Sequence, residues 1–385
     1  MALPRTVKQA VWYASARLMA KAIAFVAFIL FAREVGASHF GVYTYLVSVV
    51  ALLQPFSNLG MLGEVYRRSK SATLKFLGDF FFTALLLNFL FSLVVGLIVA
   101  LRGYSPVLVL LSMLVFLSRN LLDYINKVHM VWGRVRFLSI GGVAEKLVFS
   151  IMVLLLPKKT VFFLTSLIVS QVVTFTYLKL KLGLITKPEL TLSYFSWPFL
   201  LTAVAIAAAS RLPVLVYDWR FGVQTLGNFG AAAFIYQAFS LILIDIKTFL
   251  NARAGKFGDK QWEKLKKLTL AASILGMVFI IPSREVIVWL VNSVFGVSYE
   301  NAGILFFYQL LALPSALLLY YPTSKLLYNS PKRYFSMFFA YMIISVAFSL
   351  VAPTIEAAVL LRVLASYIQV GLGYLLASQA QRQKV

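Results

Sequence analysis

Basic side chains interrupt several long apolar stretches of the sequence, and they are the residues best placed to bind a ligand. Arg17 and Lys21 stand four positions apart, so a helix would carry both on one face. Lys146, Arg211 and Arg362 lie singly within other apolar stretches. A charge inside a bilayer is costly and therefore marks a functional site. Because arginine binds phosphate groups through paired, charge-assisted hydrogen bonds, we expect these five residues to bind an anionic substrate.

Structural roles for the same residues remain open. Arg17 and Lys21 could reach the inner interface through their long side chains or pair with an acid on another helix, such as Glu145. Arg362 could reach the outer interface, and Arg211 could pair with Asp218, two turns later on a similar face. Glu145 and Lys146 are adjacent and would point about 100° apart on a helix, so we expect each to need a partner on a different helix. Within the apolar stretches, basic residues outnumber acidic ones by 7 to 4, which favours an anionic over a cationic ligand.

The composition excludes a soluble enzyme. Of the 385 residues, 61% are hydrophobic and 13% are charged, and the mean hydropathy is +0.88. Soluble domains are closer to half apolar and a quarter charged. The chain has no cysteine and only two histidines, His39 and His129, so neither disulfides nor thiol nucleophiles are possible and a histidine-based metal centre is not expected. We expect no catalytic residues, no cofactor and no metal.

The apolar stretches have the length of membrane-spanning helices and lack the alternation of membrane-spanning strands. The sequence therefore predicts an all-α integral membrane protein with about twelve transmembrane helices. Their predicted ranges are 11–32, 39–62, 74–101, 105–126, 136–156, 160–180, 194–216, 226–249, 266–290, 302–328, 333–352 and 355–378.

The basic residues alternate with the predicted connections. With the N-terminus inside, 23 of the 36 Lys and Arg residues fall in inner connections or termini and 6 in outer ones. This bias predicts that both termini are cytoplasmic in a multi-pass protein of the cytoplasmic membrane. It also accounts for most of the net charge of +23 through topology and anionic membrane lipids, so no nucleic-acid partner is expected. The segment 250–267 is basic and amphipathic, which favours a helix on the inner membrane surface anchored by Trp262.

A short internal repeat divides the chain. Phe40-Gly41 opens the second predicted span, and Phe229-Gly230 opens the eighth, 189 residues later. The sequence thus predicts two pseudo-symmetric six-helix lobes around a central cavity, with alternating access by rocking of one lobe against the other. We expect an N-terminal lobe at 1–182, a cytoplasmic linker at 183–193 and a C-terminal lobe at 194–385.

Two segments resemble the polysaccharide flippases, the O-antigen-type branch of the multidrug/oligosaccharidyl-lipid/polysaccharide exporter superfamily. The first contains Ala32-Arg33, Gly36 and Phe40-Gly41-Val42-Tyr43, followed by Gly60, Gly63, Arg67 and Arg68. The second contains Phe295-Gly296, Tyr299 and Ala302. The resemblance implies a twelve-helix, two-lobe transporter for polyprenyl-diphosphate-linked sugars. It also implies a role in substrate binding for the first-helix pair Arg17 and Lys21, although Lys21 stands where the family would lead one to expect arginine.

Together these observations predict a flippase that moves a polyprenyl-(di)phosphate-linked oligosaccharide from the inner to the outer leaflet through a cationic cavity. Its partners would be the lipid-linked sugar and membrane lipids, and the sequence does not choose a coupling ion. Two alternatives remain. An ion-coupled multidrug or cation exporter of the same superfamily would need an uncompensated carboxylate early in a lobe. An integral-membrane sugar transferase would need outer-face carboxylates with a metal, or a large outer loop.

Overall fold

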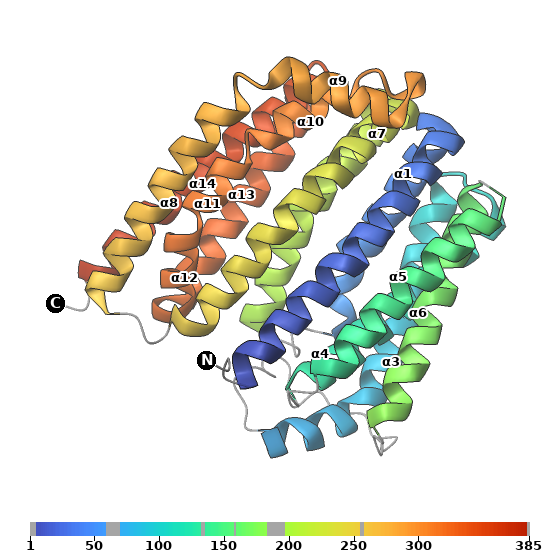
Figure 1. Cartoon of the computed structure of the whole chain (residues 1–385), viewed down its shortest axis with the longest axis horizontal. Helices are drawn as coiled ribbons and strands as arrows, with labels where there is room; N and C mark the ends of the chain where they lie inside the picture. Colours follow the sequence, from blue (N-terminus) through green and yellow to red (C-terminus); the bar gives the residue numbers. More distant parts are fainter. Residues whose placement is uncertain are drawn as a thin grey trace. The chain divides into compact units, whose positions relative to one another are not determined.

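The computed structural model describes residues 5–58, 70–131, 135–157, 159–182, 197–254 and 258–382, and these ranges are built of helices joined by short connections (Figure 1). In chain order, the first half contains α1 (Arg5–Leu53), the short 3-10 helix η1 (Gln54–Asn58), α3 (Lys70–Leu101), α4 (Pro106–Val131), α5 (Val135–Leu155) and α6 (Thr160–Leu182). The second half contains α7 (Trp197–Ala254), α8 (Asp259–Ile280), α9 (Arg284–Phe295), η3 (Val297–Tyr299), α10 (Ala302–Leu310), α11 (Leu313–Leu318), α12 (Tyr320–Asn329), α13 (Pro331–Val351) and α14 (Ile355–Arg382).

Two of the helices are much longer than a bilayer is thick. At about 1.5 Å per residue, the 49 residues of α1 would extend roughly 74 Å and the 58 of α7 roughly 87 Å, against a hydrocarbon core of about 30 Å. Each is kinked at a glycine with a non-helical backbone: Gly36 has φ 74° and ψ 168°, and Gly222 has φ 81° and ψ 167°. Only glycine adopts this combination without strain, so a residue with a Cβ would oppose both kinks.

The described helices provide eight segments that are long and apolar enough to cross a membrane, or ten when two bent helix pairs are each taken as one span. The distribution of side chains fits a lipid environment. On α3, Leu85, Leu86 and Phe89 face outward, whereas Ser92 on the same helix is completely buried. Apolar exposure of this extent is rare in soluble monomers and is expected of a surface that faces hydrocarbon.

The chain divides into two compact units. The first comprises Met1–Val35 and Leu46–Val204, and the second comprises Gly36–Tyr45 and Ala205–Val385. The predicted linker 183–193 lies outside the described residues, so the lobe boundaries at 182 and 194 stay a prediction.

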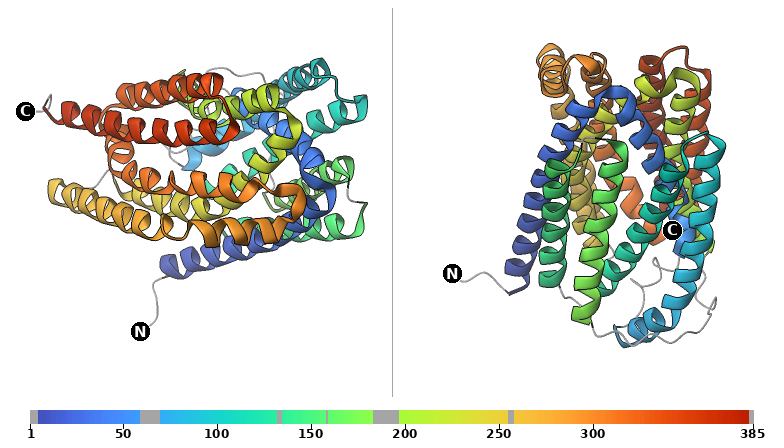
Figure 2. Two further views of the ribbon diagram at one scale, coloured as in Figure 1. Left: turned by 90° about the horizontal axis from the view of Figure 1, so that it is seen from above. Right: turned by 90° about the vertical axis from the view of Figure 1, so that its right-hand side faces the viewer.

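In the first unit, α4 packs against α3 and α6, and α5 packs against α6 (Figure 2). A buried hydrogen bond of 2.7 Å from Ser118 Oγ to Gln171 Oε1 joins α4 to α6. The part of α1 that precedes Gly36 contacts α6 through Phe31, whose ring stacks on Phe163 with centroids 3.8 Å apart. Buried polar contacts such as the bond between Ser118 and Gln171, together with close packing, hold helices together where lipid provides no hydrophobic driving force between them.

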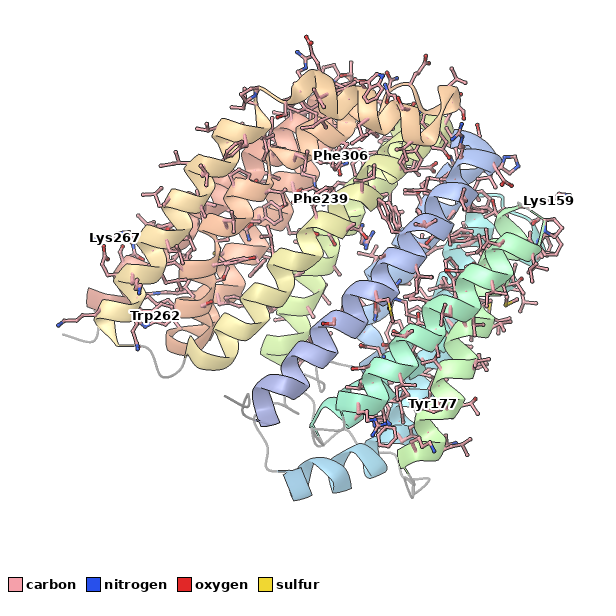
Figure 3. The ribbon with its side chains drawn as sticks, viewed as in Figure 1. Lys159, Tyr177, Phe239, Trp262, Lys267 and Phe306 are labelled. Carbon is pink, nitrogen blue, oxygen red and sulfur yellow. The ribbon has the colours of Figure 1, made fainter. Side chains whose placement is uncertain are left out.

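In the second unit, α13 and α14 run side by side, and α14 also contacts α10, α11 and α12 (Figure 1). The helix α7 folds back on itself at Gly222, which brings Tyr217 against Phe229 with ring centroids 5.0 Å apart. We refer to residues 205–221 as the first arm of α7 and to residues 223–254 as the second arm. Phe306 of α10 contacts Phe239 of the second arm, with centroids 6.0 Å apart (Figure 3).

The second unit also contains a crossing of two glycine-bearing segments, Gly36–Tyr45 and Gly222–Gly230. A Cβ on Gly41 would lie 1.9 Å from the carbonyl oxygen of Val223, and a Cβ on Gly227 would lie 1.8 Å from that of Ala37. Adding 186 to the residue numbers turns Gly41 into Gly227 and Ala37 into Val223, so each contact is the counterpart of the other. The same difference of 186 separates the two kinked glycines, Gly36 and Gly222. The segments are therefore equivalent and meet about an approximate two-fold relation.

The predicted offset of 189 residues is therefore wrong by three. The Phe-Gly pairs are identical in sequence but differ in position by almost one helical turn, so they are not structural equivalents. The alignment of the two halves is set instead by the close contact of the two backbones, which requires glycine at positions 41 and 227.

The second segment of the family resemblance forms a tight corner between α9 and α10. Phe295, Tyr299 and Ala302 are completely buried, and Gly296 ends α9 with φ 88°. The ring of Tyr299 contacts that of Phe40, with centroids 6.1 Å apart. Phe40 of the first resembling segment and Tyr299 of the second thus pack against each other in the second unit.

The ninth predicted span and the predicted surface helix differ from the structure. Residues Asp259–Ile280 form one helix, α8, and α9 follows it at an angle of 72°. Trp262 is only 7% exposed and packs edge-on against Tyr321, with centroids 6.0 Å apart, so its expected role as an exposed lipid anchor is wrong. The apolar face of the start of α8, which the sequence pattern assigns to lipid, packs against α12, and Lys267 on the same helix is exposed.

Candidate functional site

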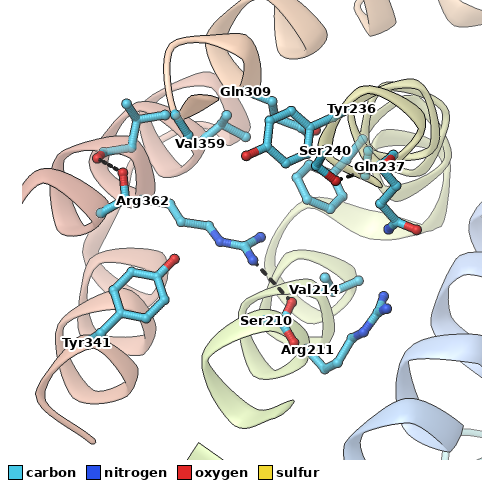
Figure 4. Close-up of a pocket in the computed structure, with 15 residues that line it drawn as sticks. Ser210, Arg211, Val214, Tyr236, Gln237, Ser240, Gln309, Tyr341, Val359 and Arg362 are labelled. Atoms are coloured by element: carbon cyan, nitrogen blue, oxygen red, sulfur yellow. Dashed lines mark hydrogen bonds between the residues drawn. The ribbon is translucent and has the colours of Figure 1, made fainter. Parts of the chain in front are cut away.

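A cavity of about 400 Å³ lies within the second unit, between the two arms of α7 and the helices α13 and α14 (Figure 4). The break between α10 and α11 forms a further wall. The residues that line it are Ser210, Arg211, Val214, Phe229, Ala233, Tyr236, Gln237, Ser240, Gln309, Ala312, Tyr341, Val359, Arg362, Val363 and Ser366. Its volume falls in the range of about 300–1,000 Å³ typical of small-molecule sites.

Arg362 is the principal charged group of this cavity. It extends from α14 toward the first arm of α7, where Nη2 donates a hydrogen bond of 3.3 Å to the carbonyl oxygen of Ser210 (Figure 4). Its guanidinium also contacts the phenol groups of Tyr217 and Tyr341 through hydrogen bonds, and Tyr236 is close enough for an electrostatic interaction. A guanidinium has five N–H donors, so these contacts orient it and leave donors for a ligand.

No carboxylate neutralises Arg362 within the described ranges: its partners there are a carbonyl group and phenols. Holding a permanent cation in a low-dielectric interior without a counter-charge is costly. Such an arrangement is expected where an anionic ligand supplies the missing charge.

Arg211 lines the same cavity from the first arm of α7. Figure 4 shows its side chain extending away from Arg362, on the other side of Ser210. The structure thus brings together two of the five predicted site residues, which lie 151 positions apart in the sequence. None of the lining residues that the structure describes is Asp or Glu, so the charge of these residues favours anions.

Of the other predicted site residues, Lys146 is described and does not line this cavity. Lys146 on α5 forms an ion pair of 2.5 Å with Glu145, so the expectation that these neighbours need partners on different helices is wrong. Long side chains on adjacent positions can curl toward each other even though their Cβ atoms diverge. Arg17 and Lys21 lie on α1 before the kink at Gly36, and their side chains lie outside the part of the structure that is described.

The sequence reasoning missed the uncharged members of the site. Gln309 and the three tyrosines around Arg362 are ordinary residues of apolar helices by pattern alone. Pro314, in the middle of a predicted span, is the signal that could have led to Gln309, because proline interrupts a helix and frees backbone groups. Among the described residues, no group of three or more His, Asp or Glu side chains could hold a metal ion.

No family model and no curated protein sequence matches the chain, whereas solved structures do match it. The chain is similar to the inward-facing conformation of a multidrug resistance MATE family transporter of the MOP superfamily. The identity is 13%, the TM-score is 0.69, and the match covers 98% of this chain and 100% of that one. It is also similar to the lipid II flippase MurJ in an inward closed conformation, with 12% identity, a TM-score of 0.73, and coverage of 95% of this chain and 87% of that one.

A third similar structure is a MOP superfamily transporter from Pyrococcus furiosus, for which reverse polarity of the binding pocket suggests a different function. Here the identity is 13%, the TM-score is 0.60, and the match covers 98% of this chain and 96% of that one. The chain has the fold of the MOP superfamily transporters. The similarity confirms, at the level of the fold, the resemblance expected from the sequence, and the eight apolar helices support a multi-pass membrane protein.

Proposed function

We propose that this protein is a transporter that flips a polyprenyl-(di)phosphate-linked oligosaccharide from the inner to the outer leaflet of the cytoplasmic membrane. The observation that carries the proposal is the cavity of the second unit, whose described lining contains two arginines and no carboxylate. The MOP fold alone is compatible with drug export and with lipid flipping, because both kinds of protein are among the similar structures. The sign of charge in the cavity favours the anionic, lipid-linked cargo.

The proposal includes twelve membrane crossings in two six-helix lobes. Eight apolar helices and two bent pairs supply ten spans, and the kinks at Gly36 and Gly222 would turn α1 and α7 into two spans each. An even number agrees with the charge bias of the connections, which favours cytoplasmic positions for both termini.

In the proposed mechanism, the isoprenoid tail stays in hydrocarbon while the polar head crosses inside the protein by alternating access. A diphosphate loses its hydration when it enters such a site, and guanidinium donors replace the lost hydrogen bonds. Arg362 and Arg211 would contact the phosphate groups, and Arg17, Lys21 and Lys146 remain further candidates. No covalent bond changes in this cycle, so the protein would not act as an enzyme.

Transport in reconstituted vesicles tests the proposal. The wild-type protein should move a fluorescent polyprenyl-diphosphate oligosaccharide across the bilayer. Arg362→Gln, which keeps polar donors but removes the charge, should lower the rate by about ten-fold or more, because hydrogen bonds to charged groups contribute roughly 1.5–3 kcal/mol. Arg136→Gln is the matched control, since Arg136 is exposed at the start of α5 and does not line the cavity.

Equal rates for the Arg362→Gln and Arg136→Gln variants would refute the role of the cavity. Export of a lipophilic cationic drug by the wild type, without movement of the lipid-linked sugar, would instead establish the exporter alternative.

A further inference from the structure

The tenth predicted span bends by 47° between α11 and α12, and before that bend its backbone tightens at Leu311 and Ala312, where it forms a wall of the cavity. Instead of one helix over 302–328, the chain forms α10, α11 and α12 in succession. At the first break, the backbone tightens: Leu311 N–H bonds to the carbonyl of Tyr308 at 3.2 Å, and Ala312 N–H bonds to that of Gln309 at 3.0 Å. Pro314 then has no N–H with which to continue the preceding helix.

Side chains from neighbouring helices stabilise this break. Tyr367 of α14 donates a hydrogen bond of 3.0 Å to the carbonyl of Leu311, and Ser273 of α8 donates one of 3.0 Å to the carbonyl of Pro314. Ser315 and Ser366 share a further hydrogen bond of 2.7 Å. Within a membrane, irregular backbone is tolerated where protein satisfies it or where it lines a cavity, and discontinuous helices often mark binding sites.

Gln309 lies at this break and lines the cavity opposite Arg362 (Figure 4). Its side chain is 8% exposed, and its Nε2 has no hydrogen-bond partner in the described part of the chain. A buried amide donor without a partner destabilises the fold, and at the wall of a cavity a bound acceptor would satisfy it.

We infer that Gln309 and Arg362 together bind a phosphate group; this inference rests on the proposed function. The two donors come from different walls, Gln309 from α10 and Arg362 from α14. A tetrahedral phosphate presents oxygens in several directions and can accept from both walls, whereas a planar carboxylate presents two oxygens in one plane. The cavity takes the phosphate end of the cargo, and Gln309 adds a neutral donor to the charge of the arginine.

Binding of small phosphates to the purified full-length protein in detergent tests this inference. The probes are inorganic pyrophosphate and farnesyl diphosphate, measured by isothermal titration at low ionic strength. Gln309→Leu should weaken the binding of both by about ten-fold, and Gln309→Glu should abolish it through charge repulsion. Gln369→Leu is the matched control, because Gln369 on α14 is also buried with a partnerless Nε2 but does not line the cavity.

The outcomes separate the inference from the proposed function. Affinity of the Gln309→Leu variant equal to that of Gln369→Leu, or no binding of either probe by the wild type, overturns the inference. If Arg362→Gln still abolishes flipping in vesicles in that case, the proposed function stands without it.

Tighter binding of farnesyl diphosphate than of pyrophosphate supports a lipid-linked source of the phosphate. Binding of pyrophosphate alone, lost in Gln309→Leu, supports the phosphate site and refutes the lipid-linked cargo. Every variant is first checked for monodisperse elution and a melting temperature like that of the wild type.

Discussion

Replacing Gly227 with alanine probes the closest backbone contact of the second unit. The new Cβ would lie 1.8 Å from the carbonyl oxygen of Ala37, 2.6 Å from its carbonyl carbon and 3.0 Å from its Cα. Real Cβ atoms essentially never approach within 3.0 Å, so the two crossing segments must separate by more than an ångström. Because the obstructing atoms belong to the backbone, no side-chain rotation can relieve the clash.

The size of the effect follows from overpacking. Forcing extra volume into a packed contact costs about 1–3 kcal/mol, and the equivalent contact of Gly41 with Val223 would be disturbed by the same separation. We expect the upper part of this range, which corresponds to a fall in Tm of roughly 3–4 °C for a chain of this length. A thermal melt in detergent, followed by size-exclusion chromatography with fluorescence detection, measures it.

Gly371→Ala is the control for this prediction. Gly371 lies in the middle of α14 and a Cβ there would meet nothing within 4 Å. Alanine should therefore leave the Tm unchanged or raise it slightly, since it is the better helix former by about 1 kcal/mol. The reasoning fails if both variants melt at the temperature of the wild type.

Three further predictions follow from the same contacts. Gly230→Ala should also lower the Tm, but Thr44→Ala should rescue it, because the atoms nearest to the new Cβ, the closest 2.1 Å away, belong to the Thr44 side chain rather than to the backbone. Ser273→Ala should destabilise the protein by about 1 kcal/mol through the lost hydrogen bond at the helix break, whereas exposed Ser336→Ala should have almost no effect in the same melt. Sulfate, an anion that does not titrate near neutral pH, should bind in the cavity with an affinity that stays constant between about pH 5.5 and 8.5, because none of the described lining residues is Asp, Glu or His and arginine keeps its proton throughout; a titration midpoint within that window would contradict this assignment.

The amino-acid sequence by itself determined that this protein lies in a lipid bilayer and that its secondary structure is helical. A chain with 61% hydrophobic residues in runs of spanning length must place its helices in a bilayer, whatever its tertiary arrangement. The same pattern predicted helices over most of the ranges that are helical, although α1 and α7 each join two predicted spans and the segments around α8–α9 and α10–α12 are bent, and it identified Arg211 and Arg362 as charges within apolar spans. Side-chain hydropathy carries this information locally, and no distant contact is needed to obtain it.

Only the tertiary structure decided which of those charges share a site and which neighbours complete it. Arg211 and Arg362 line one cavity because the first arm of α7 lies beside α14, where Arg362 donates a hydrogen bond to the carbonyl of Ser210, and Gln309 lines it too, at the turn between α10 and α11. The register of the internal repeat likewise came from backbone approach at Gly41 and Gly227 rather than from matching letters. Contacts between residues far apart in sequence depend on three-dimensional closeness, which hydropathy along one chain does not encode.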